Sequence, residues 1–172
     1  GRGGQGMKTA SRILGTAFFL EGFEVQDAPR YGAERRGAPI FAFVRADRSP
    51  INERGIIHNP DLVIVADDSL VGVPAAGVLA GLDAHSLLLI NSHEDEVTWT
   101  RRLNLSGPVL ILPSAGDVED RAAMPFAGTL CAGAAARLIG VIGKEALSAA
   151  IRRELAPLGD AIVRKNLERA GA

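Results

Sequence analysis

Leu62-Val63-Ile64-Val65-Ala66-Asp67-Asp68 decides the fold class of this 172-residue chain. A continuous apolar run that is rich in β-branched residues and ends in two aspartates is typical of a strand buried on both faces, as in a parallel sheet. Residues 87–90 and 109–112 form two further runs of the same kind, and each ends in polar or turn residues. We therefore expect a parallel sheet that contains strands at 62–66, 87–90 and 109–112.

The segments around these strands supply the helices and the remaining strands. Residues 4–21 carry an apolar face at helical spacing and are followed by Gly22, which indicates a helix. Strands are expected at 23–28 and 40–44, separated by a loop at 29–39 that is rich in Gly and Pro. A short helix is expected at 74–82. The C-terminal tail is expected to be helical over residues 126–142, 144–155 and 158–169.

This order of elements predicts one α/β domain that spans residues 1–172. Strands alternate with helices early in the chain and helices gather late, which favours three layers, Rossmann-like, with a mostly parallel sheet, helices on both faces and a helical C-terminal tail. A glycine-rich loop normally follows a strand, yet this chain begins on such a loop. Either another segment replaces that strand or, as we expect, the strand is missing from this sequence, because a sheet without its central strand would expose its edges.

The composition narrows the classes of function. The net charge is −1, from 19 basic and 20 acidic residues, and aromatic residues make up only 5%, so no nucleic-acid-binding surface is expected. No apolar run is long enough to span a bilayer, so no membrane partner is expected. Cys131 is the single cysteine, which leaves no disulfide framework and no cysteine ligand set for a metal. A reducing, cytoplasmic location fits these features.

The first chemical motif is the glycine loop, Gly1-Arg2-Gly3-Gly4-Gln5-Gly6. Gly1, Gly3 and Gly6 have the G-x-G-x-x-G spacing, in which glycines let the backbone approach a phosphate closely. The helix behind the loop directs free N–H groups and its positive dipole end at the anion. Thr9 lies in the first helical turn, where its hydroxyl could reach the same ligand. A tight turn that binds nothing is the alternative reading of this motif.

A dinucleotide site is one functional interpretation of the glycine loop. It requires an acidic residue about 20 residues on, near the end of the second strand. Glu21, Glu24 and Asp27 lie in that neighbourhood. The loop is not followed by Gly-Lys-Ser/Thr, so it is not a nucleotide-binding P-loop.

The second motif is Tyr31-Gly32-Ala33-Glu34-Arg35-Arg36-Gly37-Ala38-Pro39. Glycines and a proline hold Arg35 and Arg36 in a shaped turn, and arginine suits bidentate contacts to phosphate or carboxylate. A solvated charge run with local ion pairing is the alternative.

The two motifs together resemble the gamma subunits of 2-oxoacid:ferredoxin (acceptor) oxidoreductases, the group that acts on pyruvate, 2-oxoisovalerate, indolepyruvate and 2-oxoglutarate. The resemblance covers most of the chain, because the strand 40–44, the Pro50-Ile51 turn, the Asn59-Pro60-Asp61 segment and the helical tail fall in the family's order. Met7-Lys8 departs from the pattern, since the family commonly has two small apolar residues there. Lys8 is expected to face solvent.

The resemblance implies a role in a hetero-oligomeric enzyme that oxidatively decarboxylates a 2-oxoacid to acyl-CoA. Thiamine diphosphate with Mg and the iron–sulfur clusters are implied in partner chains: thiamine-binding alpha- and beta-type subunits and a cluster-bearing delta-type subunit. Electrons would leave to ferredoxin or another acceptor. The gamma-type domain is associated with coenzyme A binding and with assembly, and the chain would not be catalytic alone.

What the sequence lacks agrees with this division of labour. No Gly-Asp-Gly precedes a distant Asn, which is the usual magnesium–diphosphate signature of thiamine enzymes, and no set of cysteines could hold a cluster. On this resemblance, the residues expected to contact a phosphate of coenzyme A or to line the path to the thiamine site are Gly1, Gly3, Gly4, Gln5, Gly6 and Thr9. Arg35 and Arg36 would supply charge for that ligand or for a neighbouring subunit. Two alternatives remain open: a free-standing NAD(P)-binding oxidoreductase domain and a purely structural assembly subunit.

The other polar residues favour structural roles. His58, His85 and His93 have no metal-like spacing. Asp67-Asp68 ends a strand where α/β ligand sites gather, but capping of the next segment is the favoured reading. Residues 94–96 are expected to form a solvated turn. Cys131 is expected to be a small buried residue on a helix whose Ala/Gly face, residues 127–136, permits close packing within the chain or between subunits.

Overall fold

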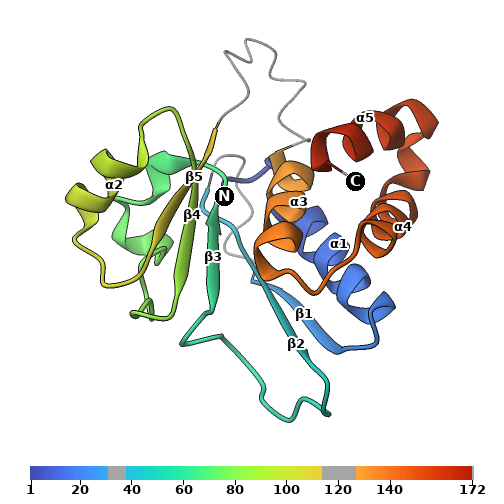
Figure 1. The fold of residues 1–172 in the computed structure, drawn as a ribbon, viewed down its shortest axis with the longest axis horizontal. Coiled ribbons are helices and arrows are strands. Elements are labelled where there is room, and N and C mark those ends of the chain that lie inside the picture. The colour runs from blue at the N-terminus through green and yellow to red at the C-terminus, as the bar shows by residue number, and fades with distance from the viewer. Residues whose placement is uncertain (31–37, 114–126, 172) are drawn as a thin grey trace.

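The computed structural model describes residues 1–30, 38–113 and 127–171 (Figure 1). The five strands and five α-helices of these described residues follow the predicted order, except that α2 is added and the short helix expected at 74–82 is not an α-helix. They are α1 (Met7–Leu20), β1 (Glu24–Arg30), β2 (Phe41–Asp47), β3 (Leu62–Val65), β4 (Leu87–Ser92), α2 (Glu96–Leu103), β5 (Val109–Pro113), α3 (Ala127–Ile139), α4 (Lys144–Leu155) and α5 (Asp160–Ala170).

The expected parallel sheet is confirmed. It has the order β3-β4-β5, with Val63 opposite Leu88 and Leu89 opposite Leu110. Helices cover both faces: α2 lies on one side, and α1, α3, α4 and α5 gather on the other (Figure 1). The predicted α/β fold, with helices on both faces of the sheet and a helical C-terminal tail, is therefore confirmed.

Side chains of the sheet alternate between two apolar cores, as the period of two in a strand requires. Val65, Leu88, Ile90 and Val109 pack with Trp99 of α2 in one core. The other core is built mainly from α1, α3, α4 and α5, and the half-buried Leu62 and Ile64 of β3 pack against it. The strands are thus apolar on both faces, which explains their continuous hydrophobic runs.

The two early strands take a different arrangement from the sheet. β1 pairs with β2 in antiparallel register, from Glu24 opposite Asp47 to Arg30 opposite Phe41, as a separate two-stranded sheet. This hairpin packs against α1. An ideal Cβ built on Gly15 of α1 would lie 3.4 Å from a methyl carbon of Val25 in β1. The strand that follows α1 therefore does not join the parallel sheet.

Two expectations about local structure were wrong. The helix expected at 74–82 is only a 3₁₀ turn at Pro74–Ala76, because Gly77 and Gly81 adopt positive φ angles of 54° and 76°, which break a right-handed helix. The turn expected at 94–96 begins α2 instead. The Asp95 carboxylate accepts a hydrogen bond of 2.8 Å from the backbone N–H of Thr98 and so caps this helix.

The Ala/Gly face of α3 packs within the chain. An ideal Cβ on Gly128 would lie 2.2 Å from the carbonyl oxygen of Gly6, and one on Gly133 would lie 2.5 Å from that of Ala170. Both contacts are backbone to backbone, so only glycine lets α3 approach the glycine loop and α5 this closely.

Within the described residues, no helix is both long and apolar enough to cross a membrane.

Replacing Gly128 with Ala should destabilise the chain and displace the glycine loop, because the new methyl group collides with the Gly6 carbonyl. We expect a loss of about 1–3 kcal/mol in the free energy of unfolding, measured by urea denaturation. Gly72→Ala is the matched control, since a Cβ at Gly72 meets nothing within 4 Å and the residue lacks a positive φ. Equal stability of the two variants would contradict the packing described here.

Cys131 is buried, as the sequence predicted, and burial raises the pKa of its thiol to about 11. The thiolate is the reactive form, so at pH 8 only about one thiol in a thousand would be reactive, even before steric protection. We expect iodoacetamide to label Cys131 at a rate set by unfolding, slow in buffer and fast in urea, as measured by mass spectrometry. Rapid labelling of the folded chain would show that the α3 contact opens readily.

Candidate functional site

The glycine loop leads directly into α1. Gly6 is the N-cap residue in a left-handed conformation (φ 79°, ψ 23°), and its carbonyl accepts the first helical hydrogen bond from Ala10 at 2.9 Å. Gly4 also has a positive φ of 96° and is exposed. No side chain of the described residues caps α1. The first-turn N–H groups and the positive end of the helix dipole lie directly behind the glycine loop, an arrangement that suits an anion.

The loop is held on one side by the segment that follows the arginine motif. Gly3 donates its N–H to the Ala38 carbonyl at 3.0 Å, and Ile40 donates to the Gly1 carbonyl at 2.7 Å. Arg2 and Pro39 form an antiparallel bridge between these bonds. Arg35 and Arg36 themselves lie outside the described residues, but their motif ends beside the glycine loop.

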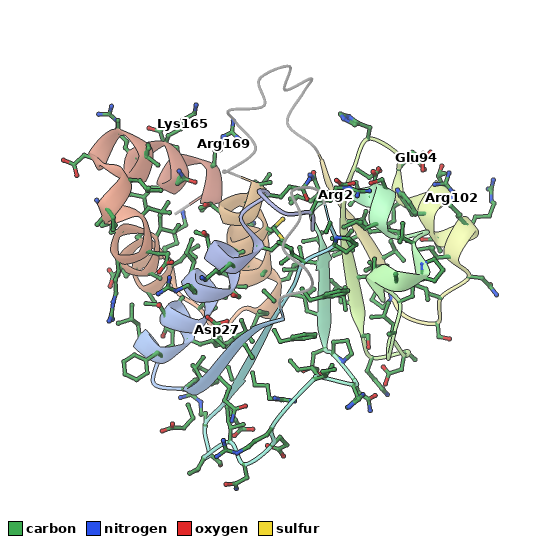
Figure 2. The ribbon with its side chains drawn as sticks, turned by 180° about the vertical axis from the view of Figure 1, so that it is seen from behind. Arg2, Asp27, Glu94, Arg102, Lys165 and Arg169 are labelled. Carbon is green, nitrogen blue, oxygen red and sulfur yellow. The ribbon has the colours of Figure 1, made fainter. Side chains whose placement is uncertain are left out.

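On its other side the loop is bound to the end of β3 by a cluster of polar side chains. The Arg2 guanidinium donates from Nε to Asp67 Oδ2 at 3.0 Å and from Nη2 to Ser69 Oγ at 2.8 Å. Gln5 donates its amide Nε2 to the same Asp67 oxygen at 3.0 Å, and its Oε1 accepts the Arg2 backbone N–H at 2.7 Å. Figure 2 shows Arg2 beside the upper end of the sheet.

The polar cluster further stabilises the charged form of Asp67. Partial burial alone would raise its pKa, but hydrogen bonds from Ser69 and Gln5 and the charge of Arg2 outweigh burial and hold the pKa below its ordinary value of 3.8. Asp67 also caps the following 3₁₀ turn by accepting the Ser69 N–H at 3.2 Å, so the expected capping role is confirmed. The carboxylate therefore joins strand, turn and glycine loop.

The candidate residues differ in what they can contribute. Gly4 and Gly6 shape the loop, and Gly1 and Gly3 anchor it. Gln5 is buried, and its amide makes the two hydrogen bonds within the cluster, so it positions the loop. Thr9 is half-buried in the first turn of α1.

Comparison with known proteins decides the family. The family model for pyruvate ferredoxin/flavodoxin oxidoreductase matches residues 1–172. The chain belongs to this family. It is 37% identical over 153 residues to the pyruvate/ketoisovalerate oxidoreductases common subunit gamma of Pyrococcus furiosus. This alignment covers 88% of this chain and 82% of that protein. It is 35% identical over 152 residues to pyruvate synthase subunit PorC of Methanosarcina barkeri, covering 88% and 81% respectively.

Solved structures agree with the family. The crystal structure of pyruvate oxidoreductase subunit PORC from Thermotoga maritima matches with a TM-score of 0.77 and 31% identity, covering 99% of this chain and 88% of that one. A keto/oxoacid ferredoxin oxidoreductase gamma subunit from Geobacter sulfurreducens matches with a TM-score of 0.65 at 18% identity, which supports the fold. The resemblance to gamma subunits drawn from the two motifs is thus confirmed.

Two residues of the polar cluster at the end of β3, Arg2 and Asp67, were not among the ligand-site candidates expected from the sequence. Arg2 stands inside the glycine motif, and Asp67 ends a buried parallel strand, where ligand sites of α/β proteins gather. Those two signals together could have paired them. The histidines gave no such signal, and the described residues contain no group of three or more His, Cys, Asp or Glu placed to hold a metal.

Replacing Asp67 with Asn should loosen the glycine loop, because Arg2 loses its ionic partner while the side-chain shape is kept. We expect a loss of about 1–3 kcal/mol in unfolding free energy at pH 7. Since folding depresses the Asp67 pKa, its contribution is present above about pH 4 and is lost as the pH falls through the folded-state value. Urea denaturation between pH 6 and pH 3 should therefore show stability falling more steeply in the wild type than in Asp67→Asn; parallel profiles would contradict the ion pair.

Proposed function

We propose that this chain is the subunit of a 2-oxoacid oxidoreductase complex that carries neither thiamine diphosphate nor iron–sulfur clusters. In this proposal the complex oxidatively decarboxylates a 2-oxoacid to acyl-CoA, and the chain contributes to coenzyme A binding and to assembly. It is not catalytic by itself. Residues 1–172 act as one gamma-type domain.

The observation that carries the coenzyme A role is the fixed position of the glycine loop at the start of α1. A phosphate group favours such a place because free N–H groups and the helix dipole point at it. A nearby carboxylate would repel that phosphate, but Asp67 is neutralised by Arg2 at 3.0 Å. The loop can therefore accept a negative charge although an aspartate lies directly beneath it.

In the proposed site, Gly4, Gly6 and Thr9 contact a phosphate of coenzyme A, while Gly1, Gly3 and Gln5 keep the loop in shape. Arg35 and Arg36 add positive charge for the same ligand. Their assignment rests on the sequence motif and on the hydrogen bond that ties Ala38, two residues beyond Arg36, to Gly3.

The chemistry of decarboxylation and electron transfer is assigned to partner chains. Thiamine diphosphate and Mg would lie in alpha- and beta-type subunits, and iron–sulfur clusters in a delta-type subunit that passes electrons to ferredoxin or another acceptor. Cysteine thiolates are the usual ligands of these clusters, four to each. This chain has one cysteine, and it is buried.

The geometry favours this proposal over a free-standing NAD(P) domain. A dinucleotide fold needs the strand after the loop helix to lie in the parallel sheet and to offer a carboxylate to the ribose. Here that strand, β1, pairs with β2 in a separate antiparallel sheet. Of the three acidic candidates, Glu21 instead accepts the Gly143 N–H at 2.8 Å.

Replacing both Arg35 and Arg36 with Ala should raise the apparent KM for coenzyme A in the assembled complex at least about 10- to 100-fold, since the loss of even one charged hydrogen bond costs about 1.5–3 kcal/mol. The KM for the 2-oxoacid should change little. Steady-state kinetics of the purified complex measures both. Arg152→Ala with Arg153→Ala is the matched control, because these adjacent arginines are exposed on α4.

Two results would count against the proposal. An unchanged KM for coenzyme A would remove the arginines from the ligand site. Failure of the double variant to assemble, with normal kinetics in whatever complex does form, would favour the purely structural role.

A further inference from the structure

A pocket of about 750 Å³ lies at the opposite side of the parallel sheet from α1. Its walls are residues 68–80, which follow β3, and the helix α2, which follows β4. The carboxyl ends of neighbouring parallel strands are where α/β proteins place binding sites. The glycine loop does not line this pocket, so the proposed coenzyme A site leaves it without a role.

The wall of the pocket is mainly apolar. Val71, Val78, Leu79 and Leu103 line it, together with Trp99, the single tryptophan of the chain. Trp99 is held in place because its indole Nε1 donates to Ser92 Oγ at 3.0 Å, and that hydroxyl donates to Asp68 Oδ2 at 2.6 Å. A fixed apolar hollow of this kind suits a bulky hydrophobic side chain.

The rim of the pocket is acidic. Asp68 and Glu94 carry carboxylates there, and the one cation among the described lining residues, Arg102, is paired with Glu94 by two contacts of 2.6 and 3.0 Å. Arg102 also lies over the Trp99 ring, with its guanidinium carbon 4.6 Å from the ring centroid. An anionic ligand would meet an excess of negative charge, so the pocket favours a neutral or cationic occupant.

The acidic character extends well beyond the rim. Asp95 and Glu96 follow Glu94 at the start of α2, so with Asp68 this region carries four carboxylates against Arg101 and Arg102 of the same helix. At the start of α2, Glu94, Asp95 and Glu96 are all exposed, and Val97 beside them is 63% exposed. The surface at the start of α2 therefore places the exposed apolar side chain of Val97 next to several carboxylates.

We propose that this pocket, bounded by residues 68–80 and α2, docks a bulky apolar side chain carried on a positively charged segment of another subunit. Apolar burial in the pocket would supply the affinity, and the carboxylates at the start of α2 would select and steer the basic partner. The inference rests on the proposed function only in requiring that the chain is a subunit; it does not require coenzyme A.

Hydrogen exchange in the assembled complex, compared with the free chain, tests this surface. We expect the backbone amides of residues 68–80 and 96–103 to exchange about tenfold more slowly in the complex, with or without coenzyme A. Equal exchange in the complex and the free chain would overturn the proposal. Protection that appears only when coenzyme A is added would also overturn it, because the pocket would then be a ligand site.

Charge and shape are tested by two substitutions. Glu96→Lys should weaken association of the chain with its partners about tenfold or more and make it less sensitive to salt. Glu145→Lys is the matched control, since Glu145 is likewise an exposed acidic residue in the first turn of its helix, α4. Equal affinities of the two variants would refute the role of charge.

Gly72→Phe supplies the test of shape. Gly72 lines the pocket with open space beside it, so the added ring can occupy the hollow without straining the backbone. We expect this variant to fold with an unchanged urea midpoint and to lose both association and the exchange protection of α2. Normal association of a folded Gly72→Phe chain would show that no side chain enters the pocket.

Discussion

The ion pair between Arg2 and Asp67 is the contact on which the site depends. It joins the glycine loop at one end of the chain to the carboxyl end of β3, 65 residues later. Gln5 reinforces the pair by bonding both the Asp67 carboxylate and the Arg2 backbone. Without this pair, the loop would be held only by its backbone bonds to residues 38–40, and its glycines add little conformational restraint of their own.

The two consecutive aspartates at the end of β3 serve opposite sides of the sheet. Asp67 turns toward the glycine loop and α1, while Asp68 bonds Ser92 and borders the pocket beside α2. Their partners differ in charge: a cation neutralises Asp67, and a hydroxyl leaves Asp68 negative. One side of the fold can therefore accept an anion, and the other repels one. In our account these sides hold coenzyme A and a basic partner segment, respectively.

The sequence predicted the fold where a single physical pattern dominated. The three parallel strands are buried on both faces, so their apolar runs were unambiguous, and the tail helices were delimited by Gly143 and Pro157. The prediction failed where local signals competed. The apolar residues at 74–82 suggested a helix, but Gly77 and Gly81 require positive φ, and Asp95 was interpreted as part of a turn although it caps α2.

The site was only partly predictable for a related reason. A glycine motif followed by a helix is local, so the loop could be found from spacing alone. Arg2 and Asp67 meet only because the chain folds, and nothing in their spacing along the sequence encodes that pairing. The Trp99–Ser92 contact at the pocket joins residues only seven apart, but it depends on α2, the helix that the sequence did not reveal.

The most direct measurement is electron cryo-microscopy of the assembled complex with coenzyme A at saturating concentration. The account predicts density for a phosphate of coenzyme A within hydrogen-bonding distance of the backbone N–H groups at the start of α1, with the Arg2–Asp67 pair intact behind the loop. Well-defined coenzyme A bound elsewhere, with no density at the glycine loop, would contradict it.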